Sequence, residues 1–340
     1  MLVYNDYIRK IGIGPKMRQK AVSIDVTNRC NLRCRHCFFW RVENLGELSI
    51  EGWKEVLGKL PKFLYCSWVG GEPLLRKELI ETGKNKFLIN EVVTNGTVPI
   101  PSWNDVSFFI SIDGTKHYHE VIRGKGTYDL ARENIKTTGA RYLLLNMVVN
   151  SLNYRSIEKF VSEWSNSKVL WVKFSFYTPF IGGENSLFLP FKKRNEIIDR
   201  VLKPLKENYG DFIFISDALL ESMKYPNCLK VTSDCPATKL ILSLDSMGKI
   251  KYRSCGGRRA CYMGAGAICE KCGHMTPHYL RAIYEMEDWE IIRKSIKHIP
   301  RGVALKAIKS LLPKTICKKL SRGTNKEHIV EKQNKDEFNV

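Results

Sequence analysis

Six short apolar runs, rich in β-branched and aromatic residues, recur along the first half of the chain. Segments with helical spacing of apolar residues lie between most of them, at 50–59, 128–138 and 156–164. The apolar runs are 21–26, 63–69, 87–93, 106–112, 142–149 and 169–176. Strands that alternate with helices form parallel βαβ units, so this pattern predicts an α/β domain with a parallel sheet.

Beyond residue 180 the alternating pattern stops. A helical stretch follows at 191–208, and residues 240–252 are typical of a β-hairpin that turns at Asp245-Ser246-Met247-Gly248. The pattern therefore predicts four parts: an N-terminal extension over 1–20, a barrel domain over 21–180, a smaller cysteine-rich domain over 181–280, and a basic helical tail over 281–340.

The composition is that of a soluble globular protein, with 340 residues, 44% hydrophobic and 26% charged. No apolar stretch reaches the ~18–20 residues of a membrane span, and the first residues lack the apolar region of a secretory signal. These features predict a cytoplasmic protein. Eleven cysteines in such a chain indicate metal or redox chemistry rather than disulfides.

Positive charge is concentrated near the C-terminus of a chain whose net charge is +20. Residues 293–335 carry thirteen Lys or Arg against Glu327 and Glu331, and 302–312 has the spacing of an amphipathic helix. Such a helix binds an anionic membrane surface peripherally, or it packs on the barrel ahead of a solvated tail. Basic charge also suits nucleic acid, but no aromatic platform or known module for nucleic acids accompanies it.

Cys30, Cys34 and Cys37 form a C-x3-C-x2-C run that is the most specific feature of the sequence. A [4Fe–4S] cluster offers four irons to thiolates, so three cysteines leave one iron open for a ligand. Structural zinc sites pair C-x2-4-C with a second pair, which fits this spacing poorly. His36 lies between two of the cysteines, and we expect it to be structural or to face solvent.

Three further motifs follow apolar runs in the predicted sheet. They are Gly70-Gly71-Glu72-Pro73, Thr94-Asn95-Gly96 and Ser111-Ile112-Asp113-Gly114. Each alone is ordinary turn chemistry. In barrels of this kind, however, the carboxyl ends of parallel strands gather at one face, where active sites form. The sequence therefore predicts that these motifs meet the cysteine loop.

The order of these four motifs resembles the radical S-adenosylmethionine (SAM) superfamily. The resemblance implies a partial (β/α)6 TIM-like barrel, a cluster on Cys30, Cys34 and Cys37, and reductive cleavage of SAM to a 5′-deoxyadenosyl radical. It also implies an electron donor such as a flavodoxin or ferredoxin. Asn146 and Tyr177 are weaker candidates for lining the pocket. The residues that the resemblance assigns to SAM binding are Phe38, Gly70, Gly71, Glu72, Pro73, Thr94, Asn95, Ser111, Asp113 and Arg123. For Arg123 a solvated loop arginine is an equal alternative.

A second cysteine group follows in the C-terminal half and resembles the auxiliary-cluster (twitch or SPASM) domains of the same superfamily. The resemblance favours one further [4Fe–4S] cluster on Cys235, Cys255, Cys269 and Cys272. Cys261 is an alternative ligand, and a structural zinc ribbon is the competing use of four thiolates. Cys66 and Cys228 are expected to be packing residues.

The substrate stays open among peptides, sugars, cofactor precursors and lipids, because no further motif selects one. A related branch joins the adenosyl group to a polyprenoid lipid, which would suit a membrane-bound tail. A different class, a non-catalytic iron–sulfur or zinc protein, needs saturated metal sites, and a three-cysteine site would serve no purpose there.

Overall fold

The computed structural model describes residues 21–41, 46–61, 63–251, 266–285 and 288–297. The chain divides into two compact units, 1–298 and 299–340, and all described residues lie in the first. The predicted helix over 302–312, Cys255, Cys261 and the part of the basic tail beyond residue 297 lie outside the described residues.

Seven parallel strands form one sheet in the order β6-β5-β4-β3-β2-β1-β7. The prediction of a parallel α/β sheet is confirmed, and the first six strands overlap the six apolar runs. The strands are β1 Ala21–Asp25, β2 Tyr65–Val69, β3 Ile89–Thr94, β4 Val106–Ser111, β5 Tyr142–Val149, β6 Trp171–Phe176 and β7 Ile241–Leu244.

The seventh strand was not predicted as part of this sheet. Residues 241–244 were expected to be one arm of a hairpin in a separate domain, but they pair in parallel with β1, with Ala21 opposite Ile241. The expected turn is present, because Gly248 N donates to Asp245 O and Lys251 N donates to Ser243 O. The prediction that this apolar run forms a strand is confirmed. Besides the turn that follows it, the strand pairs with the edge of β1 that β2 leaves open.

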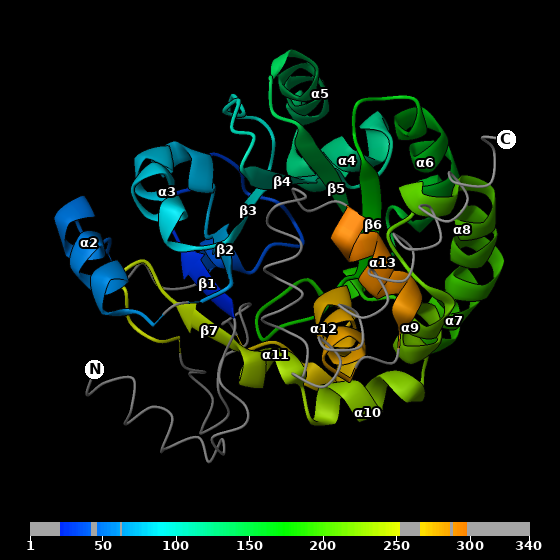
Figure 1. Cartoon of the computed structure of the whole chain (residues 1–340). Helices are drawn as coiled ribbons and strands as arrows, with labels where there is room; N and C mark the ends of the chain where they lie inside the picture. Colours follow the sequence, from blue (N-terminus) through cyan, green and yellow to red (C-terminus); the bar gives the residue numbers. More distant parts are fainter. Residues whose placement is uncertain (1–20, 42–45, 62, 252–265, 286–287, 298–340) are drawn as a thin grey trace, which may run out of the picture. The chain divides into compact units, whose positions relative to one another are not determined.

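The helices of the barrel lie outside the arc of strands, whereas α12 and α13 lie on its other side (Figure 1). Helix α2 shows why a local sequence becomes a helix here: Ser49 caps it by accepting from Gly52 N, and Trp53 and Leu57, one turn apart, are both buried. The helices are α2 Ile50–Lys59, α3 Lys77–Gly83, α4 Lys116–Arg123, α5 Thr127–Thr137, α6 Ile157–Ser165, α7 Phe191–Ile197, α8 Lys203–Tyr209, α9 Asp217–Met223, α10 Asn227–Ser233, α11 Pro236–Leu240, α12 Met275–Glu285 and α13 Trp289–Lys297. A π-helical turn, Ile198–Leu202, joins α7 to α8.

The two faces of the sheet differ in burial. Along β2 and β3, Cys66, Trp68 and Val92 on the helix-covered outer face are fully buried. Their neighbours on the inner face, such as Ser67 and Glu91, keep intermediate exposure. Because successive side chains of a strand point to opposite faces, this alternation shows that the inner face remains accessible to solvent or a ligand.

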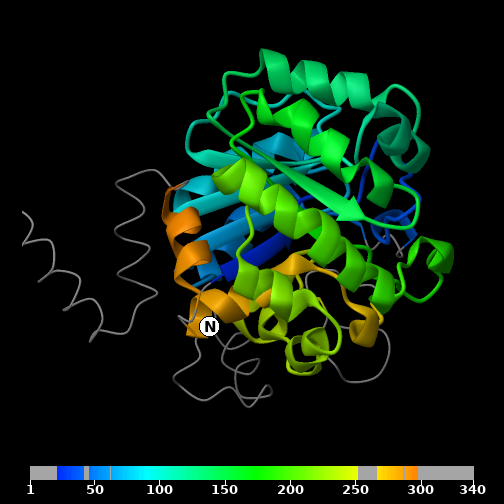
Figure 2. The ribbon, with the colours of Figure 1, turned by 90° about the vertical axis from the view of Figure 1, so that its right-hand side faces the viewer.

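The two ends of the strands also differ. The loops that follow the strands, including the cysteine loop, lie at one end, and α12 and α13 lie toward the strand starts at the other (Figure 2). The strand ends therefore carry the candidate site. In the described part of the chain, no helix combines the length and the apolar character that crossing a bilayer requires.

Candidate active site

Cys30, Cys34 and Cys37 lie on the loop that follows β1. The loop is tightly turned, since Cys37 N donates to Cys34 O at 3.1 Å. Backbone N–H groups face two of the sulfurs: Leu32 N lies 3.4 Å from Cys30 Sγ and Phe39 N lies 3.3 Å from Cys37 Sγ. Burial raises the pKa of Cys34 to about 11 and also raises that of Cys30. The unligated thiols are therefore protonated at neutral pH, and ligation must displace their protons.

Gly70 and Gly71 place the loop after β2 against the cysteine loop. Gly71 N donates to Thr27 O at 2.9 Å and Glu72 N donates to Arg29 O at 2.8 Å. A Cβ atom on Gly71 would lie 2.1 Å from Arg29 O, and one on Gly70, whose φ is +130°, would lie 2.6 Å from Thr27 O. Only glycine permits this approach of two backbones. The backbone of the cysteine loop is therefore what requires glycine at positions 70 and 71.

The carboxylate of Glu72 is fully buried and joins the ends of β2 and β3. Its Oε1 accepts from Leu74 N at 3.0 Å and from Thr94 Oγ1 at 2.8 Å, and its Oε2 accepts from Asn95 N at 2.7 Å. Burial raises the pKa of Glu72, and these donors oppose the rise. The resemblance assigns Glu72 to SAM binding, and in this structure its two oxygens accept from three protein donors.

Hydrogen bonds through residues 94–97 connect Glu72 to the cysteine loop. The Asn95 side chain donates to Asn31 Oδ1 at 2.9 Å, and the same Nδ2 lies 4.0 Å from Cys30 Sγ. Its Oδ1 accepts from Thr97 N at 2.8 Å, which fixes the amide orientation. The motifs predicted after β2 and β3 therefore meet the loop that carries the cysteines.

Asp113, after β4, is the centre of a buried charged cluster. Its Oδ2 accepts from Arg123 Nε at 2.7 Å and lies 2.8 Å from His36 Nε2, and its Oδ1 accepts from Val148 N at 2.9 Å. Burial alone would raise the pKa of Asp113, but Arg123 and His36 hold it well below its usual range. Burial likewise opposes the charge of Arg123, yet Asp113 raises its pKa.

Arg123 connects this cluster to the cysteines. It is the last residue of α4, its side chain is buried, and its Nη1 lies 3.9 Å from Cys34 Sγ. The alternative of a solvated loop arginine is therefore wrong. A guanidinium beside three thiols that lose their protons on ligation offsets part of the resulting negative charge.

His36 has the structural role that was one of its two expected alternatives, because its side chain is 8% exposed and contacts Asp113. Glu47 was not predicted from the sequence. It accepts from Asn28 N at 2.9 Å and from the Thr27 hydroxyl, so it fixes the start of the cysteine loop. No motif surrounds Glu47 that could have identified it.

The remaining predicted residues lie around this centre. The Phe38 ring packs edge-to-face on Phe180, with centroids 6.2 Å apart. Pro73 begins the 3-10 turn Pro73–Arg76. Ser111 is the last residue of β4 and stands beside Asn146 in the register of β5.

Cys272, one of the described cysteines of the second group, lies near the end of β6. Cys272 Sγ lies 3.8 Å from Thr178 Oγ1, and burial raises the pKa of Cys272. Cys272 N donates to Cys269 O at 3.0 Å in the turn Cys269–Lys271, and Cys235 precedes α11. Cys66 and Cys228 are buried, as expected of packing residues.

Arg194 fixes the segment that carries Cys272. Its guanidinium is buried and donates to the carbonyl oxygens of Tyr177 at 2.7 Å, Leu189 at 3.1 Å, Lys271 at 3.2 Å and Cys272 at 3.4 Å. Burial lowers the pKa of Arg194 to about 10, although the charges of the neighbouring Cys272 and Cys228 oppose this decrease. One side chain thus joins α7, the end of β6 and the Cys269–Cys272 turn.

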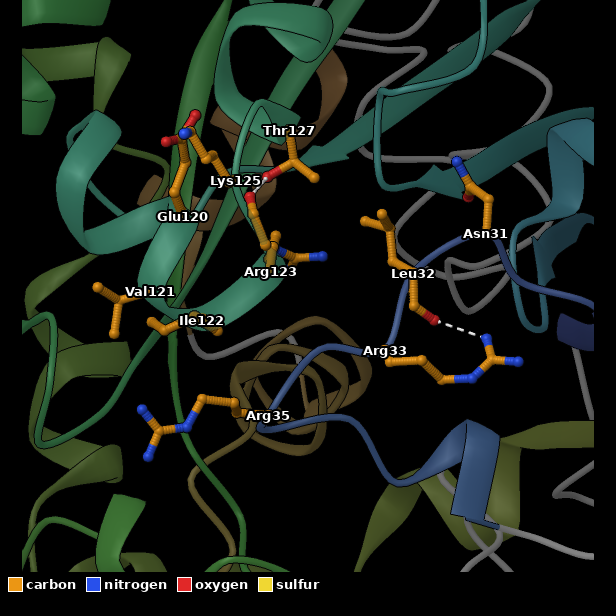
Figure 3. A pocket seen from close by; sticks show the side chains of 11 residues that line it. Asn31, Leu32, Arg33, Arg35, Glu120, Val121, Ile122, Arg123, Lys125 and Thr127 are labelled. Atoms are coloured by element: carbon orange, nitrogen blue, oxygen red, sulfur yellow. Dashed lines mark hydrogen bonds between the residues drawn. The ribbon is translucent and has the colours of Figure 1, made fainter.

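A pocket of about 380 Å³ opens beside the cysteine loop, between residues 31–35 and residues 120–127 (Figure 3). Arg35 N donates to Ile122 O at 3.0 Å and joins its two walls. Four basic residues, Arg33, Arg35, Arg123 and Lys125, line it against one acidic residue, Glu120. Arg35 pairs with Glu184 and Arg123 pairs with Asp113, so Arg33 and Lys125 against Glu120 leave this surface with a small excess of positive charge.

The donor set of the cysteine loop fits an iron–sulfur cluster better than it fits a hard cation. Its three ligating atoms are thiol sulfurs, the soft donors that such clusters take, and backbone N–H groups and Arg123 stand beside them. Among the described residues, no three His, Cys, Asp or Glu side chains are arranged to hold a single metal ion.

Known proteins resemble the chain over this same region. Residues 24–162 match the model of the Radical SAM superfamily. The chain is 33% identical to pre-heme d1 synthase of Dinoroseobacter shibae over 34% of its length and 33% of the relative's. It is 28% identical to the cysteine-type anaerobic sulfatase-maturating enzyme of Clostridium novyi over 39% of its length and 44% of the relative's. These matches span less than half of either relative.

A solved structure shares the fold. SuiB from Streptococcus suis, bound to S-adenosylmethionine, superposes with a TM-score of 0.57 at 14% identity, covering 76% of this chain and 66% of SuiB. At this identity the likeness concerns the fold alone. The open seven-stranded parallel sheet of this chain agrees with this likeness in fold. Residues 24–162 are thus similar in sequence to the Radical SAM superfamily, and the fold of the chain is similar to that of SuiB.

Proposed function

We propose that this protein is a radical SAM enzyme that cleaves SAM reductively and uses the resulting radical on a substrate. The observation that carries the proposal is the convergence of the three-cysteine loop with Glu72, Asn95, Asp113 and Arg123 at the carboxyl end of the sheet. When bound to the three cysteines, a [4Fe–4S] cluster would supply the one electron that splits SAM into methionine and a 5′-deoxyadenosyl radical.

The residues of the chain prepare this site. Cys30, Cys34 and Cys37 would hold the cluster, and the Asp113–Arg123 pair keeps a positive charge beside Cys34. Glu72 fixes the Thr94–Asn95 turn, so we assign to Glu72 and Asp113 the positioning of groups that bind SAM. Phe38, Gly70, Gly71, Pro73 and Ser111 line the same end and belong to the proposed SAM site.

A second cluster is part of the proposal. Cys235, Cys269 and Cys272 would share it with Cys255 or Cys261, and zinc is the alternative occupant. The buried cation of Arg194 beside Cys272 favours a ligand set that carries negative charge.

The basic pocket beside the cysteine loop supports an acidic electron donor, such as a flavodoxin or ferredoxin. A cytoplasmic location belongs to the same proposal. The substrate remains one of peptide, sugar, cofactor precursor or lipid, and the names of the two relatives point to different products. The lipid alternative depended on the predicted amphipathic helix over 302–312, which lies outside the described residues.

The test is anaerobic reconstitution of the full chain with iron and sulfide. We expect about eight irons per chain from two clusters, and formation of 5′-deoxyadenosine from SAM after reduction with dithionite. Replacing Cys30, Cys34 and Cys37 together by Ala should remove about half of the iron and all SAM cleavage. C66A is the matched control, because Cys66 is a buried thiol outside both groups.

Iron retained at the full value in the triple variant would contradict the cluster assignment. Full iron without 5′-deoxyadenosine would instead indicate the non-catalytic iron–sulfur class. Stoichiometric zinc that survives in the triple variant would assign the second cysteine group to zinc.

A further inference from the structure

The segment after β6, residues 179–187 (the β6 loop), contacts the cysteine loop at two points. Arg35 forms a bidentate ion pair with Glu184, with Nη2 at 2.5 Å from Oε1 and Nε at 3.2 Å from Oε2. The Phe38 ring packs edge-to-face on Phe180, with centroids 6.2 Å apart. The third cysteine lies between these two residues of the cysteine loop. The β6 loop therefore contacts the cysteine loop on both sides of that cysteine.

Both ends of the β6 loop are fixed by backbone hydrogen bonds to other segments. At its start, Ile268 N donates to Pro179 O at 2.9 Å, and at its end Ser151 N donates to Leu187 O at 3.1 Å. Ile268 directly precedes Cys269, so the start of the loop rests on the segment that carries the second cysteine group. Only the part between the two ends reaches the first cysteine group.

The middle of the β6 loop is exposed and contains two glycines. Ile181 is 70% exposed, and a Cβ atom on Gly182, whose φ is +77°, would meet open space. The side chains of Arg35 and Glu184 are 43% and 26% exposed, so their ion pair belongs to the class that contributes little to stability. A contact of this strength can hold a loop closed and still let it open in thermal fluctuations.

Movement of the β6 loop would uncover the surface beside the third cysteine. Phe180 and Leu187 are buried in a small apolar cluster against which Phe38 packs. Cys37, which precedes Phe38, keeps intermediate exposure while the loop is closed. Opening of the loop would therefore give water and small reagents access to this side of the cysteine loop.

We propose that the β6 loop is a lid over the first cysteine group and that the Arg35–Glu184 pair is the latch that keeps it closed. The lid rests on the proposed function in that the group it shields is the cluster held by Cys30, Cys34 and Cys37. Because the latch is a partly exposed ion pair, salt screens it and favours the open lid.

The first measurement is amide hydrogen exchange of the β6 loop, read by mass spectrometry on the anaerobically reconstituted full chain. E184Q keeps the size of the side chain and removes its charge, so we expect exchange in the loop to become about two- to fivefold faster. R35Q should give the same increase, and R35Q/E184Q should exchange no faster than either single variant, because each variant already lacks the latch. D129N breaks the exposed Lys116–Asp129 pair and is the matched control, with wild-type exchange in the β6 loop.

Salt provides an independent test of the latch. At about 1 M salt the Debye length is about 3 Å, so exchange in the wild-type loop should approach that of E184Q, whereas E184Q itself should not change. Wild-type exchange in E184Q, no effect of salt on the wild type, or additive effects of R35Q and E184Q would each overturn the latch. Hydrogen exchange needs no bound metal, so this result is independent of the proposed function.

The second measurement follows iron loss from the reconstituted protein to a ferrous chelator. The iron of interest is the part that the triple Ala variant of Cys30, Cys34 and Cys37 lacks. E184Q should lose this iron about two- to fivefold faster than the wild type, and D129N should lose it at the wild-type rate.

Faster hydrogen exchange in E184Q with unchanged iron loss would show that the loop moves without shielding the cysteines, and it would overturn the lid. Neither measurement reads SAM cleavage. A chain whose E184Q variant shows both increases, but which forms no 5′-deoxyadenosine, would contradict the proposed function and leave the lid standing.

Discussion

Replacing Asp113 by Asn should destabilise the fold strongly, because it leaves Arg123 as a buried charge without its partner. The side chain of Asp113 is fully buried and that of Arg123 is 8% exposed, so solvent screens little of the interaction. Removing one partner of a buried ion pair costs about 3–5 kcal/mol. An Asn amide would also turn one N–H₂ toward a donor, either Val148 N or the Arg123–His36 side.

The assay is thermal and urea unfolding of the reconstituted protein at neutral pH. In a compact unit of 298 residues, a loss of this size corresponds to a Tm decrease of roughly 5–8 °C. The matched control is D129N, which removes the partner of Lys116 in an exposed ion pair and should stay close to wild type. In the double variant D113N/R123M both charges are absent, so part of the lost stability should return.

The pH dependence of the stability difference between wild type and D113N tests the role of the Asp113 charge. Because the pKa of Asp113 is lowered in the folded state, its contribution is fully present above the unfolded pKa of about 3.9 and is lost as pH falls below it. The gap between wild type and D113N should therefore be constant from pH 8 to about 5. A D113N variant as stable as D129N would refute the buried-pair argument.

Two further substitutions test the segments that hold the cysteines. R194M should lower the free energy of unfolding by about 3 kcal/mol, because four carbonyl oxygens lose a buried donor. About half of the bound iron should be lost with it. Unchanged stability and iron content in R194M would show that Arg194 does not support the second cysteine group. G71A should lower iron bound by the first group, since its Cβ would meet Arg29 O at 2.1 Å and displace the cysteine loop. G58A, on α2 with open space at the Cβ position, is its control, and G71A with wild-type iron content would show that the loop tolerates the displacement.

The sequence predicted the six barrel strands because one face of each is buried under helices, which leaves an apolar run. It did not assign β7 to the sheet, since Ile241–Leu244 carries no sign that its partner is β1, about 220 residues earlier. The motifs located the site, but the contacts that Glu72 and Asp113 make were not deducible, because loop packing directs both carboxylates inward onto protein donors.

The pairing of β1 with β7 bears on the order of events during synthesis. The cysteine loop begins at the end of β1, and Asn28 in that loop donates to Ser246 Oγ at 2.6 Å, just after β7. A nascent chain that has not reached residue 246 lacks both the neighbouring strand and this contact, although its three cysteines have long been translated. Pairing over such a sequence separation is a slow, late step of folding. The loop thus acquires its final form only after most of the described chain has emerged from the ribosome, so the proposed cluster would bind only once the sheet is complete.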